Sequence, residues 1–183
     1  PTGAIIKPTA ASQTLMTHQG RALVFEDHDD LLARIDDPDL EVRPEDVLVM
    51  RNGGPIGAPG MPEWGFLPLP KKILATGVRD MVRLSDARMS GTAFGTVVVH
   101  VAPESAAGGP LGAVQTGDQI LLDVPNRKLD LLVEEREIRA RLVGIPPTPS
   151  HDKRGYRWMY AQHVQQADKG CDFDFLRSDF SGD

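Results

Sequence analysis

Two apolar runs, at residues 78–84 and 96–101, flank a polar segment that is rich in reactive side chains. Both runs have the length and composition of buried β-strands. The segment between them, residues 85–96, holds hydroxyls, one acid, one base and two glycines. A buried strand on each side predicts a tight loop that is fixed at both ends. Loops held in this way by a scaffold are common places for binding and catalytic residues.

Short apolar runs elsewhere predict further strands at residues 22–26, 47–51, 120–124 and 128–133. Few helices are expected before residue 134. The chain is therefore expected to form a mixed β core, a barrel-like domain with flanking helices at its periphery.

Helices are expected at residues 28–35, 68–75, 134–142 and 154–167. Asp27 is placed to cap the first of them, and Gly77 and Gly170 to end the second and the last. The last helix has an apolar face with the spacing of an amphipathic helix, made by Tyr156, Met159, Tyr160, His163, Val164 and Ala167. Prolines at positions 146, 147 and 149 predict a linker ahead of it.

The composition suits one soluble globular domain of 183 residues, with 40% hydrophobic and 25% charged residues. A net charge of −6 and the lack of a basic stripe disfavour nucleic acid and anionic membranes as partners. No apolar run approaches the roughly 20 residues that span a bilayer. Cys171 is the only cysteine, which excludes an internal disulfide and favours a cytoplasmic protein. The first residue is Pro1 rather than Met, so a piece of a longer protein is expected.

A second candidate loop, residues 51–63, contains four glycines and three prolines. It lacks the Lys and Ser/Thr of a phosphate-binding loop, and its prolines remove amides that would hold an anion. One interpretation is a rigid surface connection. The other is that the glycines let the backbone approach a ligand while the prolines hold Glu63 in position. A carboxylate on such a loop suits a hard cation such as Mg²⁺.

The loop at residues 85–96 also allows two interpretations. Asp86, Arg88, Ser90 and Thr92 are compatible with a solvated turn that contains an internal ion pair. Arg88 stands where a nucleophile elbow needs glycine, so a Ser-His-Asp hydrolase is disfavoured. Ser90 can instead act as a base if a nearby cation stabilises its anionic form.

The histidines show no metal-binding spacing, and packing or surface roles are favoured for His18, His28, His100, His151 and His163. Cys171, beyond the end of a helix, is expected to be inert.

Several motifs, in order along the chain, resemble the dihydroxy-acid and sugar-acid dehydratase family. They are GRALVFE at 20–26, RNGGP at 51–55, GMPE at 60–63, SDARMSGT at 85–92, HVAPE at 100–104, GGPL at 108–111 and GDQI at 117–120. The resemblance covers only the family's C-terminal domain. It implies that residues 1–183 are such a domain, with a helical extension at about 151–183. It also implies that the N-terminal domain, with the iron–sulfur cysteines and further magnesium ligands, is absent.

Within that family, the form of the loop at residues 85–96 is similar to the branch that converts aldonic acids to 2-keto-3-deoxy acids. The resemblance implies Glu63 as a Mg²⁺ ligand, Ser90 as the base that takes the C2 proton, and Thr92 as the residue that orients Ser90 or the substrate. Asp86 and Arg88 are expected to brace the loop from behind. A [2Fe-2S] cluster, or a [4Fe-4S] cluster in some members, would be bound by the N-terminal domain.

The resemblance further implies a sugar-acid substrate, contact with the protein's own N-terminal domain, and a homodimer or homotetramer. The chain alone is expected to be inactive. Alternatives are a dihydroxy-acid dehydratase of branched-chain amino-acid synthesis, a 6-phosphogluconate dehydratase, and a stand-alone binding module without catalysis. If the catalytic interpretation is right, the loops that carry Glu63 and Ser90 should lie on one face.

Overall fold

The architecture is built on one mixed sheet of seven strands, seen in a computed structural model that describes residues 1–144 and 153–176. The strands are β1 (Gly3–Ile6), β2 (Thr17–Phe25), β3 (Val47–Met50), β4 (Arg83–Ser85), β5 (Val97–Ala102), β6 (Gln119–Asp123) and β7 (Lys128–Leu131). Their order across the sheet is β1-β5-β4-β3-β2-β6-β7. The four central strands, β2 to β5, run parallel, whereas β1, β6 and β7 pair antiparallel.

The sheet curls into a half-barrel whose inner face is one apolar cluster. Buried side chains from β2 to β6 form this cluster, and Ile6 of β1 and Leu129 and Leu131 of β7 pack against it. All seven strands therefore contribute to one interior. The expected barrel-like mixed β domain with flanking helices is confirmed.

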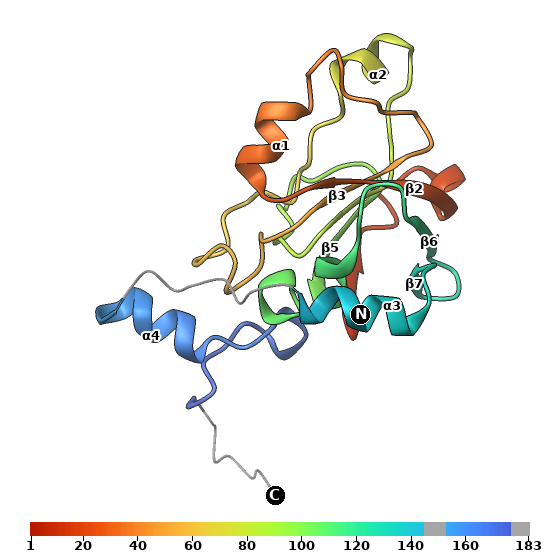
Figure 1. Ribbon diagram of the computed structural model, residues 1–183. Helices are drawn as coiled ribbons and strands as arrows, with labels where there is room; N and C mark the ends of the chain where they lie inside the picture. Colours follow the sequence, from red (N-terminus) through yellow and green to blue (C-terminus); the bar gives the residue numbers. More distant parts are fainter. Residues whose placement is uncertain (145–152, 177–183) are drawn as a thin grey trace, which may run out of the picture.

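Two helices cover the outer face of the central strands. They are α1 (His28–Arg34) and α2 (Lys71–Ala75), on the same side of the sheet in Figure 1. Leu31 of α1 and Ile73 of α2 join a second buried cluster with strand residues such as Phe25 and Leu48. Helix α3 (Glu135–Val143) lies on the other side of the sheet.

The predicted N-cap of the first helix and the predicted glycine after the second are confirmed, although the second helix begins at Lys71 rather than residue 68. Asp27 caps α1, because its carboxylate accepts the N–H of Asp30 at 2.8 Å. Gly77 follows α2 with φ +93°, the left-handed conformation that terminates helices.

One predicted strand is much shorter than expected. Only Arg83–Ser85 forms β4, and residues 78–82 lie outside it. The Asp80 side chain explains the difference, because its carboxylate accepts the N–H groups of Met81 and Thr96. The segment is thus held in part through a side chain, beside the backbone bond from the Leu48 N–H to the Val82 carbonyl at 3.0 Å.

The last predicted helix is also shorter. Helix α4 (Gly155–His163) lies apart from the sheet, at the lower left of Figure 1. Val164 leaves the helix in an extended conformation and forms a bridge with Phe173, so Val164 and Ala167 do not extend its apolar face. Gly170 instead ends the short turn η4 (Ala167–Lys169). The predicted proline linker and His151 lie outside the described residues.

No helix in the described part of the chain is long and apolar enough to cross a membrane.

Packing of α1 on the sheet is expected to contribute strongly to stability. Leu31 is fully buried, whereas its neighbour Leu32 is 56% exposed. Leu31→Ala should lower the free energy of unfolding by about 2–5 kcal/mol, because it leaves a cavity in the outer cluster. Leu32→Ala, the matched control, should change it by less than about 0.5 kcal/mol. Urea denaturation of both variants measures the difference, and equal losses would contradict this account of the packing.

Candidate active site

Two loops leave the carboxyl ends of neighbouring parallel strands. Residues 51–70 follow β3, and residues 86–96 follow β4. Since β3 and β4 are paired in parallel, both loops start from the same edge of the sheet. Ligands commonly bind outside the carboxyl ends of parallel strands.

Glycine lets the backbones of the two loops approach each other closely. A Cβ on Gly53 would lie 2.7 Å from the Cβ of Ala87, and one on Gly65 would lie 2.2 Å from the Arg88 carbonyl oxygen. Any larger residue would push the loops apart. The two glycines therefore fix the loop that carries Glu63 against the loop that carries Ser90.

An ion pair joins the exposed parts of these loops. The Arg88 guanidinium lies 3.0 Å from the Glu63 carboxylate, and both side chains are about half exposed. The loop at residues 86–96 is thus not a turn with its own ion pair between Asp86 and Arg88. Its arginine reaches the neighbouring loop instead.

Asp86 is buried, and its carboxylate accepts backbone N–H groups from two other loops. Gly53 donates to Oδ1 at 2.7 Å, and Ser105 donates to Oδ2 at 2.8 Å. Burial raises the pKa of the Asp86 carboxyl, and these N–H donors oppose the rise. Asp86 therefore connects three loops from below, and Arg88 connects two of them at the surface.

The hydroxyls of Ser90 and Thr92 lie side by side. Their oxygens are 3.1 Å apart, and the Thr92 N–H donates to Ser90 Oγ at 3.4 Å. Lys7 donates to the carbonyls of Gly91 and Ala93, at 2.9 and 3.2 Å, which fixes the backbone around this pair. Thr92 can thus offer an O–H and an N–H to the oxygen of Ser90.

Glu104 is a second buried carboxylate, and it is not among the site residues predicted from the sequence. It accepts the N–H groups of Ile56 and Gly57, and the side-chain amide of Gln166 donates to it at 2.7 Å. Burial raises its pKa, and the Gly57 and Ile56 donors oppose the rise. A carboxylate directly after a buried strand and a proline was the signal available in the sequence.

The two loops offer one accessible hard oxygen ligand, not a complete metal centre. Glu63 presents an accessible carboxylate, which fits Mg²⁺. Among the described residues no three His, Cys, Asp or Glu side chains come together as a metal site. Cys171 is the chain's only cysteine and its Sγ lies 3.5 Å from the Met61 sulfur, so these residues do not fit an iron–sulfur cluster.

The histidines take packing and hydrogen-bonding positions where they are described. His100 Nε2 accepts the Met89 N–H at 3.1 Å, and burial lowers the pKa of its imidazole. His28 stacks on Trp64, and His163 pairs with Asp174 at 2.9 Å.

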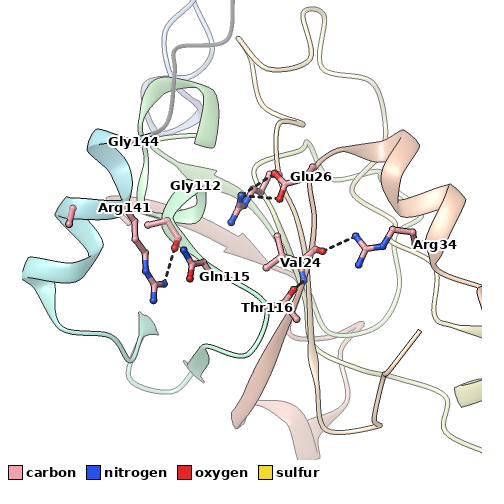
Figure 2. Close-up of a pocket in the computed structure, with 11 residues that line it drawn as sticks. Val24, Glu26, Arg34, Gly112, Gln115, Thr116, Arg141 and Gly144 are labelled. Carbon is pink, nitrogen blue, oxygen red and sulfur yellow. Dashed lines mark hydrogen bonds and ion pairs between the residues drawn. The ribbon is translucent and has the colours of Figure 1, made fainter. Parts of the chain in front are cut away.

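An open pocket of about 590 Å³ lies between β2, the turn η3 (Pro110–Ala113) and α3 (Figure 2). Three arginines line it, and each is already paired with a carboxylate: Arg34 with Asp30, Arg51 with Glu26, and Arg141 with Asp118. These cations are therefore neutralised within the chain. The pocket has less to offer an anionic ligand than its arginines alone would indicate.

Comparison with known proteins identifies a family over most of the chain. The family model for the C-terminal domain of dihydroxy-acid/6-phosphogluconate dehydratases matches residues 1–171. The chain is 53% identical over 178 residues to a 6-deoxy-6-sulfo-D-gluconate dehydratase of Pseudomonas putida. It is 52% identical over 177 residues to an L-arabinonate dehydratase of Rhizobium leguminosarum bv. trifolii. Each alignment covers 97% of this chain and 31% of the relative.

A more distant relative is a dihydroxy-acid dehydratase of Aquifex aeolicus, 37% identical over 172 residues, which are 93% of this chain and 30% of that protein. The chain thus spans about a third of the length of the curated relatives that it matches. By the extent of these matches, it belongs to the dihydroxy-acid/6-phosphogluconate dehydratase family and corresponds to that family's C-terminal domain.

Proposed function

We propose that this chain is the C-terminal part of a sugar-acid dehydratase, which removes water from an aldonic acid to give a 2-keto-3-deoxy acid. The observation that carries the proposal is the contact between the Glu63 and Ser90 loops at one edge of the sheet. The arabinonate and sulfogluconate dehydratases, at 52% and 53% identity, support a sugar acid as the substrate class.

Ser90 is the proposed base that takes the proton from carbon 2. An anionic Ser90 oxygen needs donors, and Thr92 is placed to give both its O–H and its N–H. A hydroxyl is a weak base at neutral pH, so a nearby cation has to favour its deprotonated form. The same loop supplies Arg88, and Glu63 would hold a metal close by.

Glu63 is the proposed Mg²⁺ ligand of this chain, with the other ligands supplied from outside it. When bound, magnesium would stabilise the negative charge that forms on the substrate after the C2 proton leaves. The Arg88 guanidinium, 3.0 Å from Glu63, holds that carboxylate at the surface where the two loops meet.

In this proposal the N-terminal domain would hold an iron–sulfur cluster, [2Fe-2S] or [4Fe-4S], which would supply Lewis-acid chemistry for the loss of the C3 hydroxyl. The chain alone would then be inactive. We also propose a homodimer or homotetramer of the whole protein in the cytoplasm. A dihydroxy-acid or 6-phosphogluconate substrate, and a binding module without catalysis, remain the alternatives that experiment has to separate.

Ser90→Ala in the full-length enzyme should lower kcat by at least about 10²–10⁴-fold, because it removes the base. Its bound metal, measured by elemental analysis, should stay unchanged. Ser12→Ala is a matched control, since Ser12 and Thr14 form the same kind of hydroxyl pair at 2.8 Å elsewhere on the surface. Near-normal turnover of Ser90→Ala would refute the assignment of the base.

Glu63→Gln in the full-length enzyme should weaken metal binding at least about tenfold, because a neutral amide replaces an anionic ligand. Binding of Mn²⁺, a spectroscopic substitute for Mg²⁺, can be followed by electron paramagnetic resonance. Glu41→Gln is the control, because Glu41 is also an exposed carboxylate paired with an arginine. Unchanged Mn²⁺ affinity in Glu63→Gln would exclude Glu63 as a ligand.

The substrate class can be tested with three compounds: L-arabinonate, 2,3-dihydroxyisovalerate and 6-phosphogluconate. The full-length enzyme should have its highest kcat/KM on the sugar acid without phosphate, measured by formation of the 2-keto acid. Preference for dihydroxyisovalerate or 6-phosphogluconate would favour the corresponding alternative. No turnover of any compound by the enzyme loaded with its cluster and metal would favour a binding module.

A further inference from the structure

Arg83 is a buried charge beneath the two loops of the candidate site. It is 2% exposed in β4, in the middle of an apolar stretch. Its guanidinium pairs with Asp80 at 2.9 Å. Burial lowers the pKa of Arg83, and Asp80 opposes this. A buried arginine also needs hydrogen-bond acceptors for its other N–H groups, because a buried donor without an acceptor is costly.

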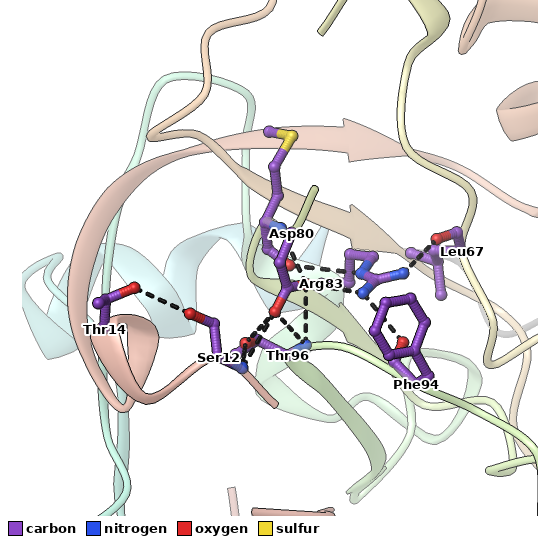
Figure 3. A network of polar contacts seen from close by, with 8 residues as sticks. Ser12, Thr14, Leu67, Asp80, Arg83, Phe94 and Thr96 are labelled. Atoms are coloured by element: carbon purple, nitrogen blue, oxygen red, sulfur yellow. Dashed lines mark hydrogen bonds and ion pairs between the residues drawn. The ribbon is translucent and has the colours of Figure 1, made fainter. Parts of the chain in front are cut away.

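Those partners are the ends of the two loops, as Figure 3 shows. Nη1 donates to the carbonyl of Leu67 at 3.0 Å, and Nη2 donates to the carbonyl of Phe94 at 3.2 Å. Leu67 comes four residues after Glu63, and Phe94 comes four residues after Ser90. The planar Arg83 guanidinium is therefore hydrogen-bonded to both loops, in each case four residues after the proposed functional side chain, Glu63 or Ser90.

Asp80 completes the arrangement on the other side of the guanidinium. Its carboxylate accepts the N–H of Thr96 at 2.9 Å and the Thr96 hydroxyl at 2.7 Å, and it also accepts the Ser12 N–H at 3.2 Å. The end of the Ser90 loop is thus held by the arginine at residue 94 and by the aspartate at residue 96.

The guanidinium of Arg83 lies directly against the backbone at Gly95. Gly95 has φ +94°, and a Cβ there would lie 1.9 Å from Arg83 Nη2. The ring of Phe66, next to Leu67, also lies over the guanidinium, with its centroid 5.8 Å away. Both loops therefore contact the same charged group at short range.

We propose that Arg83 is a positioning residue, which sets the spacing between the Glu63 carboxylate and the Ser90 hydroxyl by binding the Leu67 and Phe94 carbonyls. This inference rests on the proposed function, because the spacing matters only if these two groups act together. The planar fork of arginine can bond two carbonyls and a carboxylate in fixed directions, which a lysine ammonium cannot reproduce.

The first test is Arg83→Lys in the full-length enzyme with its cluster and metal. The substitution keeps the charge opposite Asp80, so the protein is expected to fold. It should lower kcat at least tenfold with KM changed less than threefold, and it should raise the Mn²⁺ dissociation constant at least threefold. The metal measurement is made by electron paramagnetic resonance and does not depend on turnover.

Arg21→Lys is the matched control. Arg21 is also paired with a buried carboxylate, Asp46 at 2.8 Å, but Asp46 directly precedes β3 and so lies at the opposite end of the parallel strands. At a comparable loss of Tm, Arg21→Lys should change kcat and Mn²⁺ affinity less than twofold. Equal effects of the two substitutions would show general destabilisation and overturn the proposal.

A second pair of variants leaves every charge in place. Gly95→Ala puts a methyl group where Arg83 Nη2 lies, whereas Gly77→Ala adds one at φ +93° with nothing within 4 Å. Both variants carry the same kind of backbone strain. Only Gly95→Ala should reproduce the losses in kcat and Mn²⁺ affinity.

The outcomes separate this proposal from the proposed function. If Ser90→Ala is inactive while Arg83→Lys and Gly95→Ala keep kcat within threefold of wild type or leave Mn²⁺ affinity unchanged, the positioning role is wrong and the function stands. If Ser90→Ala keeps normal turnover, the assignment of the base is wrong, and if the loaded enzyme dehydrates no sugar acid, the proposed function itself fails.

Discussion

The rest of the site depends on the hydrogen bonds that two loops donate to the buried Asp86 carboxylate. This carboxylate leaves water only because Gly53 and Ser105 give it backbone donors, and an unpaired buried charge would be costly. The requirement brings together loops that follow β3, β4 and β5. Parallel pairing of these strands supplies the common edge, and Asp86 fixes how the loops meet there.

Polar groups from the loops are accordingly satisfied by residues distant in sequence. The Glu104 carboxylate accepts hydrogen bonds from the N–H groups of Ile56 and Gly57, and the Arg83 guanidinium donates to the carbonyls of Leu67 and Phe94. Each contact restrains backbone that has no regular secondary structure of its own. The exposed side chains of Glu63 and Arg88 and the partly buried Ser90 are thus carried by irregular but well-supported segments.

Local chemistry explains what could be predicted of the fold. The cap at Asp27, the left-handed Gly77 and the short apolar strands depend on neighbours in sequence, and the structure has them as expected. The predictions of a strand at residues 78–84 and of the end of the last helix were wrong, because contacts with residues further along the chain determine both. Thr96 holds Asp80, and Phe173 pairs with Val164.

The candidate site shows the same difference between features set by local sequence and features set by distant contacts. Its two loops could be located from their composition, and the motifs indicated Glu63 and Ser90. The partner of Arg88 could not be predicted, because Glu63 lies 25 residues earlier and becomes its neighbour only through parallel strand pairing. The contacts of Arg83 and Glu104 could not be predicted for a related reason. Their partners are mostly backbone groups, which carry no residue identity in a sequence.

The link between Glu104 and Gln166 bears on how this domain can be shortened. Gln166 donates its amide to the Glu104 carboxylate and accepts the Glu104 N–H at 2.7 Å, so the two residues bond reciprocally. A truncation ahead of Gln166 would remove both bonds from a buried acid that supports residues 56 and 57. The segment after α4 is therefore an integral support of the sheet edge rather than a dispensable appendage.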